Sequence, residues 1–299
     1  HTGLVSDTPD SVVNGFLIGY VASLPVAGRL SDICPRRRIF LGSLALFAVG
    51  SLVSAVTENL WILVVARFIQ AVGGGALIPV ALCQAVCDYR GPARAIMFGI
   101  IIAVAEIGGV LGPLWGAVIT QFVGWRWIFY INLPLVGLLA ALALLVRTPT
   151  TSTGLPFDLP GALLITLGLT VLTIGMARDT TMSTGTSLGC IATGLSILVL
   201  FIVVEQRTSA PLVTIRMFKD LQFAAGNAVS LFVGGGLIVP MVNIPLYAAI
   251  VLEREAIGSG LLLMQMTLAV PLGAVCGGYI ASRIGNGIVI SVGTIMAGI

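Results

Sequence analysis

Arg67 and Glu106 are ionisable residues that stand inside long apolar stretches of this chain. A charged group is costly in hydrocarbon, so an ionisable residue placed there is a functional candidate by default. Gln70 follows Arg67 by three residues, which puts both side chains on one face of a helix. Arg67, Gln70 and Glu106 are therefore expected to line a cavity or to take part in proton coupling.

Glu106 is the only acid inside the predicted spans. Burial without a charge partner disfavours the ionised form of a carboxyl group. At a rise of 1.5 Å per residue, Arg67 lies ~9 Å and Glu106 ~22 Å from the same face of the membrane. This difference in depth exceeds the reach of a salt bridge, so no direct bridge between them is expected. Two interpretations stay open: Glu106 either ionises when a cavity opens to water, or is a protonated group that holds helices together through a backbone carbonyl.

Charge is concentrated in the segment GRLSDICPRRR, residues 28–38, although only 9% of the chain is charged. Its glycine permits a tight turn, and its aspartate can accept hydrogen bonds from a helix N-terminus or an arginine. The arginines would hold the segment at an anionic membrane surface. The charges either anchor the topology or form a gating loop. The candidates are Gly28, Asp32, Arg36, Arg37 and Arg38.

A weaker copy of this segment, GGYIASRIG, covers residues 277–285, with Gly278 and Ser282 spaced as Gly28 and Asp32 are. Repeated halves with matching loops are typical of transporters.

The composition excludes a soluble fold, because 58% of the residues are hydrophobic. A bilayer admits only helices and closed barrels, and the unbroken apolar runs favour helices. We therefore predict an all-α, polytopic transmembrane helix bundle. The expected spans are 12–28, 39–57, 61–84, 95–121, 127–146, 159–177, 187–204, 222–250 and 259–281, with a tenth that begins near 287. Pro240 and Pro245 predict a kink or a break in 222–250.

The loop charges predict the orientation of the chain. If the 28–38 loop is cytoplasmic, eleven basic residues fall on that side and three on the other, which agrees with the positive-inside rule. We expect a multi-pass protein of the cell membrane with the lipid bilayer as its main partner.

Metal and cofactor sites are not expected. The five cysteines have no framework spacing, and the only histidine is His1, so free thiols are predicted. The sequence contains no nucleophile–base pair, which argues against an enzyme. Nucleic-acid binding is not expected either.

Six segments together resemble the major facilitator superfamily, and in particular its fourteen-helix drug:proton antiporters. Besides GRLSDICPRRR they are ILVVARFIQAVGGGALIP (62–79), EIGGVLGPLWGA (106–117), WRWIFYINLP (125–134), FDLPG (157–161) and PLVTIRMF (211–218). The third segment is similar to the fifth-helix antiporter motif, carried here by Gly108, Gly112, Pro113 and Gly116. These glycines form a smooth seam for helix packing; support of antiport is implied by the resemblance alone.

The resemblance implies a truncated bundle: 1–146 as an N-terminal bundle of helices 2–6, 147–221 as a linker with an extra transmembrane hairpin, and 222–299 as the start of a C-terminal bundle. The first and the last few helices would be absent, and the fragment alone would not transport. It further implies efflux of small amphipathic molecules by alternating access, with the proton gradient as the energy source. The working form would be a monomer. The alternatives are a metabolite symporter or facilitator, or a non-transporting receptor or scaffold.

Overall fold

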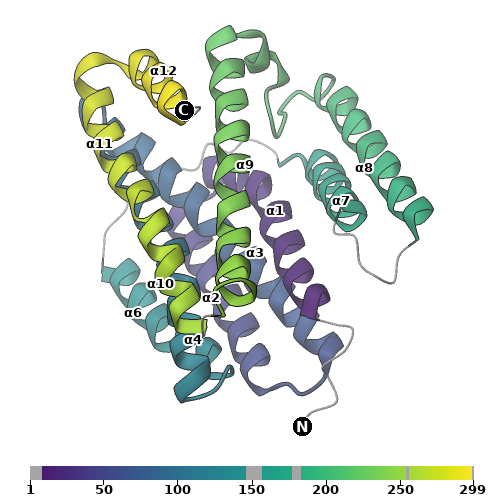
Figure 1. The fold of residues 1–299 in the computed structure, drawn as a ribbon. Coiled ribbons are helices and arrows are strands. Elements are labelled where there is room, and N and C mark those ends of the chain that lie inside the picture. Colours follow the sequence, from purple (N-terminus) through teal and green to yellow (C-terminus); the bar gives the residue numbers. More distant parts are fainter. Residues whose placement is uncertain (1–8, 146–156, 177–182, 254–255, 298–299) are drawn as a thin grey trace. The chain divides into compact units, whose positions relative to one another are not determined.

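The structure is a computed structural model, and it describes residues 9–145, 157–176, 183–253 and 256–297. All regular elements of these residues are helices (Figure 1). Nine of the described helical segments are long and apolar enough to cross a membrane. The prediction of an all-α membrane bundle is therefore confirmed.

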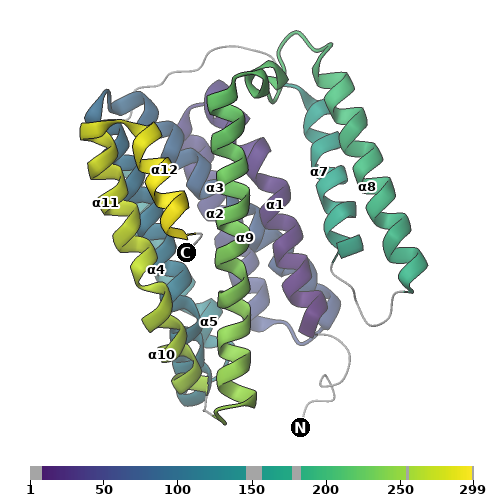
Figure 2. The same ribbon diagram turned by 45° about the horizontal axis from the view of Figure 1, so that its top comes forward.

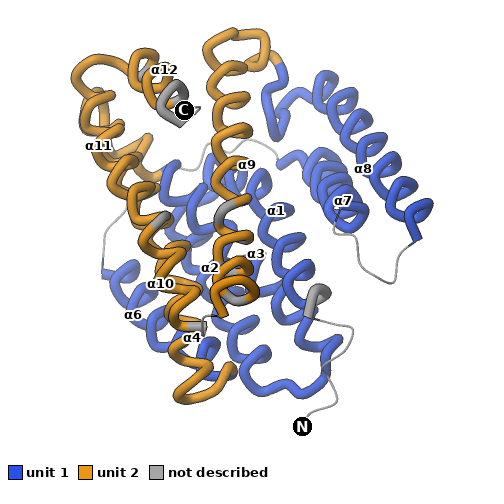
Figure 3. The backbone as a smooth tube through the Cα atoms, viewed as in Figure 1, with its two compact units in different colours: residues 1–83, 126–215 blue, residues 84–125, 216–299 orange. Residues whose placement is uncertain are grey.

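The chain forms two compact units, coloured separately in Figure 3. The first comprises residues 1–83 and 126–215, and the second comprises 84–125 and 216–299. This division differs from the predicted boundaries at 146 and 221 because the helix after residue 91 packs along helices near the C-terminus. The predicted domain boundaries stay a prediction. Part of the predicted linker, residues 147–156, lies outside the described residues.

Seven helices belong wholly or mainly to the first unit. They are α1 (Pro9–Ile33), α2 (Arg36–Val56), α3 (Leu60–Asp88), α5 (Trp127–Tyr130), α6 (Asn132–Leu145), α7 (Leu159–Met176) and α8 (Thr184–Glu205).

The second unit contains α4 (Pro92–Phe122), the 3-10 helix η1 (Ile215–Lys219), α9 (Leu221–Ile250), α10 (Ala256–Thr267), α11 (Ala269–Ile284) and α12 (Asn286–Ala297). Helix α4 packs along α10 and α11, and α9 packs on α10 and α12. Helix α12 is the expected start of a tenth span.

Prolines explain where two expected spans divide. A proline lacks an N–H group, and its ring clashes with the carbonyl four residues earlier. Helix α5 ends at Tyr130, four residues before Pro134, and α10 ends at Thr267, four residues before Pro271. Each of the expected spans 127–146 and 259–281 is thus confirmed as one candidate membrane span that consists of two consecutive helices. By contrast, 222–250 was expected to kink or break and lies within the single helix α9.

Helix α3 packs tightly between α1 and α2 because glycines bring the backbones together. A Cβ atom on Gly50 of α2 would lie 2.6 Å from the Ala66 oxygen, and one on Gly73 of α3 would lie 2.5 Å from the Ser43 oxygen. On the α1 side, a Cβ atom on Gly19 would lie 2.6 Å from the Phe68 oxygen. These three contacts fix the face that α3 presents to each neighbour.

Helices α7 and α8 form an antiparallel hairpin, seen side by side in Figures 1 and 2, and α7 also packs on α1. The hairpin corresponds to the expected extra pair of spans. Its helix α8 begins at an N-cap, where Ser183 accepts a hydrogen bond from the amide of Thr186 over 3.2 Å.

Candidate functional site

Arg67, the arginine predicted inside a span, starts a chain of hydrogen bonds that links three helical segments. Its Nη1 donates to Gln70 Oε1 over 2.7 Å, as the three-residue spacing led us to expect. Gln70 Nε2 then donates to Ser51 Oγ over 2.8 Å. Asn132 Nδ2, on α6, donates to the same Ser51 oxygen over 3.3 Å. We call these four residues the Arg67 network.

Two aromatic rings flank the guanidinium group of Arg67. Its Cζ lies 4.3 Å from the ring centroid of Phe16 on α1 and 5.5 Å from that of Phe129 on α5. Both distances are within the range of cation–π attraction. The arginine is thus held by contacts from α1, α3 and α5, which fixes the direction of its planar group.

The inner end of the Arg67 network is shielded from water. Gln70 is 2% exposed and Ser51 is fully buried, whereas Arg67 is half-buried. Arg67 has five N–H donors, and only one has a partner among the described residues. The remaining donors are available to water or to a ligand that carries acceptor oxygens.

The sequence pointed to Arg67 and Gln70 but not to their partners. Ser51 is a small residue in an apolar run, and Asn132, with Arg126 and Pro134, was interpreted as structural at the start of a helix. Their role depends on how α2, α3 and α6 pack, which no local pattern contains. The one sequence feature that indicated further partners was the amide of Gln70 inside an apolar span, because a buried amide needs hydrogen-bond partners for its donors and its acceptor.

Glu106 lies on α4 in the second unit and is half-buried. No hydrogen bond or ion pair joins Glu106 to another residue that the structure describes. Arg67 and Glu106 belong to different units, so the expected absence of a bridge between them stays a prediction.

Two glycines of the predicted seam on α4, Gly108 and Gly112, lie next to open space in the described part of the chain. A Cβ atom on Gly108 or Gly112 would meet no atom within 4 Å. Pro113 lies inside the same uninterrupted helix. A packing role for Gly108, Gly112, Pro113 and Gly116 therefore stays a prediction. Close packing in this unit occurs on another face of α4, where a Cβ atom on Gly99 would lie 2.7 Å from the Ala274 oxygen.

The charged segment 28–38 is a tight turn rather than an extended loop, because α1 continues to Ile33 and α2 begins at Arg36. Asp32 is exposed in the last turn of α1, and the three arginines occupy the first turn of α2. Both placements oppose the helix dipoles, which costs about 0.3–1 kcal/mol for each charge. Interactions with groups outside their own helices can offset this cost.

Arg37 shows one such interaction. Its Nη2 donates to the carbonyl oxygen of Leu144 over 2.6 Å, at the last turn of α6. A cation is favourable at a helix C-terminus, where carbonyl groups lack partners. Arg37 thereby ties the start of α2 to the end of α6.

The copy of this segment is also a tight turn. Helix α11 ends at Ile284, Gly285 has φ 92°, and α12 begins at Asn286. Only glycine adopts such a positive φ without strain. Gly278 packs on α4, since a Cβ atom there would lie 2.9 Å from the Ala95 oxygen.

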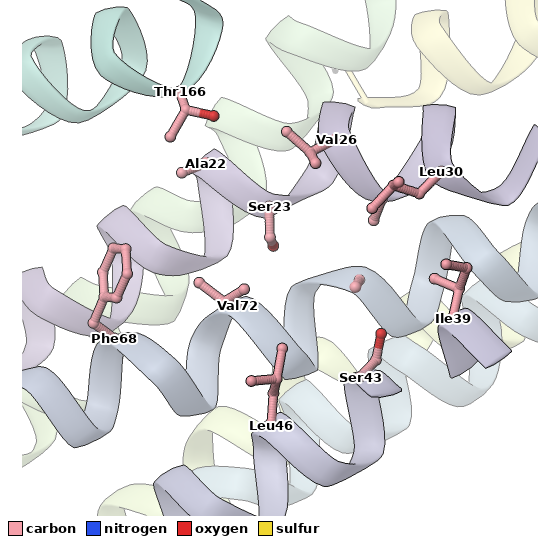
Figure 4. Close-up of a pocket in the computed structure, with 12 residues that line it drawn as sticks. Ala22, Ser23, Val26, Leu30, Ile39, Ser43, Leu46, Phe68, Val72 and Thr166 are labelled. Carbon is pink, nitrogen blue, oxygen red and sulfur yellow. The ribbon is translucent and has the colours of Figure 1, made fainter. Parts of the chain in front are cut away.

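A cavity of about 260 Å³ opens in the first unit between α1, α2, α3 and α7 (Figure 4). Its walls are almost entirely apolar; Ser23, Ser43 and Thr166 bring the polar side chains. Sequence analysis did not predict this cavity, because its walls come from four helices that only tertiary packing brings together.

No group of three or more metal-ligating side chains occurs within the described residues. The five cysteines are free thiols.

Comparison with known proteins identifies the family. The family model of the Major Facilitator Superfamily matches residues 3–299. A triacylglyceride transporter of Mycolicibacterium hassiacum is 34% identical over 96% of this chain and 55% of its own length. Multidrug resistance protein 3 of Bacillus subtilis is 30% identical over 91% of this chain and 54% of its own length.

A third relative is the lincomycin resistance protein of Streptomyces lincolnensis, which is 32% identical over 92% of this chain and 58% of its own length. The chain spans about half the length of the curated relatives it matches. These relatives are named as transporters and resistance proteins, not as enzymes. The resemblance inferred from the six motifs is confirmed: the chain belongs to the Major Facilitator Superfamily.

Proposed function

We propose that this chain serves in a secondary active transporter that exports small amphipathic molecules by alternating access, coupled to the proton gradient. The observation that carries the proposal is the Arg67 network, with a half-buried guanidinium that keeps unpaired donors between apolar helices. A membrane scaffold would have little reason to retain such a costly group. The relatives named as resistance proteins support export rather than uptake.

The apolar cavity supports an amphipathic substrate. Its volume of about 260 Å³ lies just below the usual range of sites for drug-sized ligands, so it would accept one apolar part of a substrate. A second relative named as a triacylglyceride transporter, from Mycolicibacterium smegmatis, is 32% identical to this chain. Acyl chains and the apolar parts of drugs share the chemistry that this cavity would select.

Glu106 is the proposed coupling acid. It lies in an apolar span without a hydrogen bond or ion pair to another described residue, and an ionisable residue in such a place is a functional candidate by default. Such a group would carry a proton in one transport state and release it in the other. In the first unit, Arg67 would bind polar atoms of the substrate, and Gln70 would line the same site from behind by fixing the direction of the guanidinium group.

The proposed placement is the cell membrane, with the 28–38 segment on the cytoplasmic side and the monomer as the working form. In the charged turn, Asp32 and the arginines would hold two helix ends together in one transport state.

Transport by the full-length protein in liposomes tests the proposal. The probes are ethidium and a fluorescent triacylglycerol, measured with and without an imposed pH gradient. We expect accumulation of at least one probe against its own gradient only while the pH gradient lasts. Movement that merely follows the probe's gradient would identify a facilitator, and absence of movement for both probes would contradict efflux of amphipathic molecules.

A further inference from the structure

A second acidic site lies at the base of the α7–α8 hairpin, away from the Arg67 network. Asp158 directly precedes α7, and Glu205 is the last residue of α8, so the antiparallel hairpin brings both to one end. Asp158 is 6% exposed and Glu205 is 2% exposed. Two carboxyl groups this deeply buried require partners.

Each carboxyl group uses one oxygen atom on a backbone amide. Asp158 Oδ1 accepts a hydrogen bond from the N–H of Gly161 over 3.0 Å, at the first turn of α7. Glu205 Oε1 accepts one from the N–H of Val213 over 2.5 Å. The other two oxygens, Asp158 Oδ2 and Glu205 Oε2, are buried and have no hydrogen-bond partner among the described residues.

These two oxygens face the same point. A Cβ atom on Gly161 would overlap Asp158 Oδ2 and would lie 2.7 Å from Glu205 Oε2. Both atoms therefore border the Cα of Gly161, at most about 5 Å apart, a separation at which two buried negative charges repel strongly. The absence of a side chain on Gly161 is what allows this approach.

No described cation neutralises the pair, since neither Asp158 nor Glu205 forms an ion pair with a described arginine or lysine. Helix α7 holds no titratable residue, and α8 adds only Cys190. The segments that adjoin this end of the hairpin carry three further charged groups: Arg29 and Asp32 on α1, and Arg207 on the segment after α8. Arg29 donates instead to a backbone oxygen of the segment that follows α8.

The segment 206–213, which we call the linker, is held against the hairpin and α1. Besides the Glu205–Val213 bond, Thr208 Oγ1 donates to the Val204 oxygen over 3.0 Å. Arg29 Nη2 donates to the Ala210 oxygen over 3.5 Å. The linker thus connects the end of α8 with the charged end of α1 inside one unit.

We propose that Asp158 and Glu205 share one proton and form a pH-sensitive latch that holds the linker on the hairpin. A single O–H group between Oδ2 and Oε2 provides the missing donor and removes one of the two charges. As the pH rises the proton leaves, the carboxylates repel, and Glu205 releases the amide of Val213. As the pH falls the pair is protonated again and the latch closes.

Hydrogen–deuterium exchange of the full-length protein in lipid nanodiscs tests the latch without any transport measurement. The readout is the protection of the Val213 amide, corrected for the intrinsic pH dependence of exchange. We expect protection to fall about tenfold or more between about pH 5 and about pH 8, as one carboxyl group of a close pair loses its proton. Failure of the efflux proposal would leave this readout unaffected.

Amide variants separate a shared proton from ionised carboxylates. In Glu205→Gln or Asp158→Asn, an N–H group takes the place of the proton, so protection should stay high at both pH values. Glu58→Gln is the matched control, because Glu58 lies in the same unit with a side chain 91% exposed, and it should behave as the unaltered protein does.

Three results would overturn the latch. Protection of Val213 in the unaltered protein that does not change with pH means that no proton is shared. Loss of protection at both pH values in the folded amide variants means that ionised carboxylates hold the linker. Recovery of protection at high pH on replacing choline chloride by sodium chloride means that a cation, not a proton, joins the two groups. The first result needs no variant to fold.

Discussion

Arg67 and Phe16 face each other across the interface between α3 and α1, with the guanidinium carbon 4.3 Å from the centre of the ring. The ring attracts the positive charge, while Gln70 fixes the direction of Nη1. The group is thus held by its plane as well as by its charge. A lysine could reproduce only the charge, because its ammonium group is a compact point charge.

Arg67→Lys should lower transport about tenfold or more while leaving the amount of protein in the membrane unchanged. The measurement is the initial export rate divided by the membrane level from a quantitative blot. Arg90→Lys is the control, because Arg90 is an exposed arginine outside the network, and it should be silent. Full activity of Arg67→Lys would show that directed hydrogen bonding by the guanidinium is not needed.

Gly50→Ala should destabilise the protein by about 1–3 kcal/mol, because overpacking a tight contact forces backbone shifts. The added methyl group would overlap the Gln70 backbone and lie 2.6 Å from the Ala66 oxygen. Thermal unfolding in detergent measures the effect. Gly42→Ala on the same helix is the matched control, since a Cβ atom there meets nothing within 4 Å. Equal midpoints for the two variants would contradict the close approach of α2 and α3.

Asp32→Asn should weaken transport more than it lowers the amount of protein in the membrane. Asp32 sits at the negative end of the α1 dipole, so its charge is retained against a local cost of about 0.3–1 kcal/mol. Arg37→Gln tests the anchoring role, because Arg37 binds the Leu144 carbonyl at the end of α6. We expect this second variant to lose protein and transport in equal proportion. The same proportional loss in Asp32→Asn would make the whole turn a topology anchor.

Glu106→Gln mimics the neutral carboxyl group and should insert normally but lose the response of export to pH. With the acid present, export should rise as a proton becomes available on the side from which Glu106 is loaded. The comparison is export at several external pH values for the variant, the unaltered protein and Glu58→Gln, whose side chain is exposed. An unchanged pH profile in Glu106→Gln would exclude Glu106 as the coupling acid and favour a structural role.

Hydropathy was sufficient to place the membrane spans, because every apolar residue contributes to that signal independently of the fold. The spans that contain Pro134 and Pro271 were predicted correctly as single membrane-spanning segments; only the end of one helix inside each, four residues before the proline, was not predicted. Pro240 and Pro245 were expected to kink or break 222–250: the break is contradicted, because α9 runs through both prolines, and the kink stays a prediction. Local chemistry indicates where a helix is weakened, and packing decides whether it ends there.

The candidate site was predicted only in part for a similar reason. Arg67 and Gln70 are three residues apart, so helix geometry alone brings them together. Ser51 and Asn132 join them through tertiary packing. Asp158 entered the sequence analysis only as part of the FDLPG segment, and Glu205 did not enter it, because both border an apolar hairpin whose interior lacks charge. Their proximity depends on the antiparallel pairing of α7 and α8.

The glycine contacts of α3 have a consequence for inherited variation. Every missense change of a glycine codon introduces a Cβ atom, whatever base is altered. At Gly19, Gly50 and Gly73 that atom would lie against the backbone of a neighbouring helix, which has no rotamer by which to yield. Natural variants of this protein should therefore be scarce at these codons and common at the exposed leucines and valines of the same helices. A survey of natural variants would then map this interface without any biochemical assay.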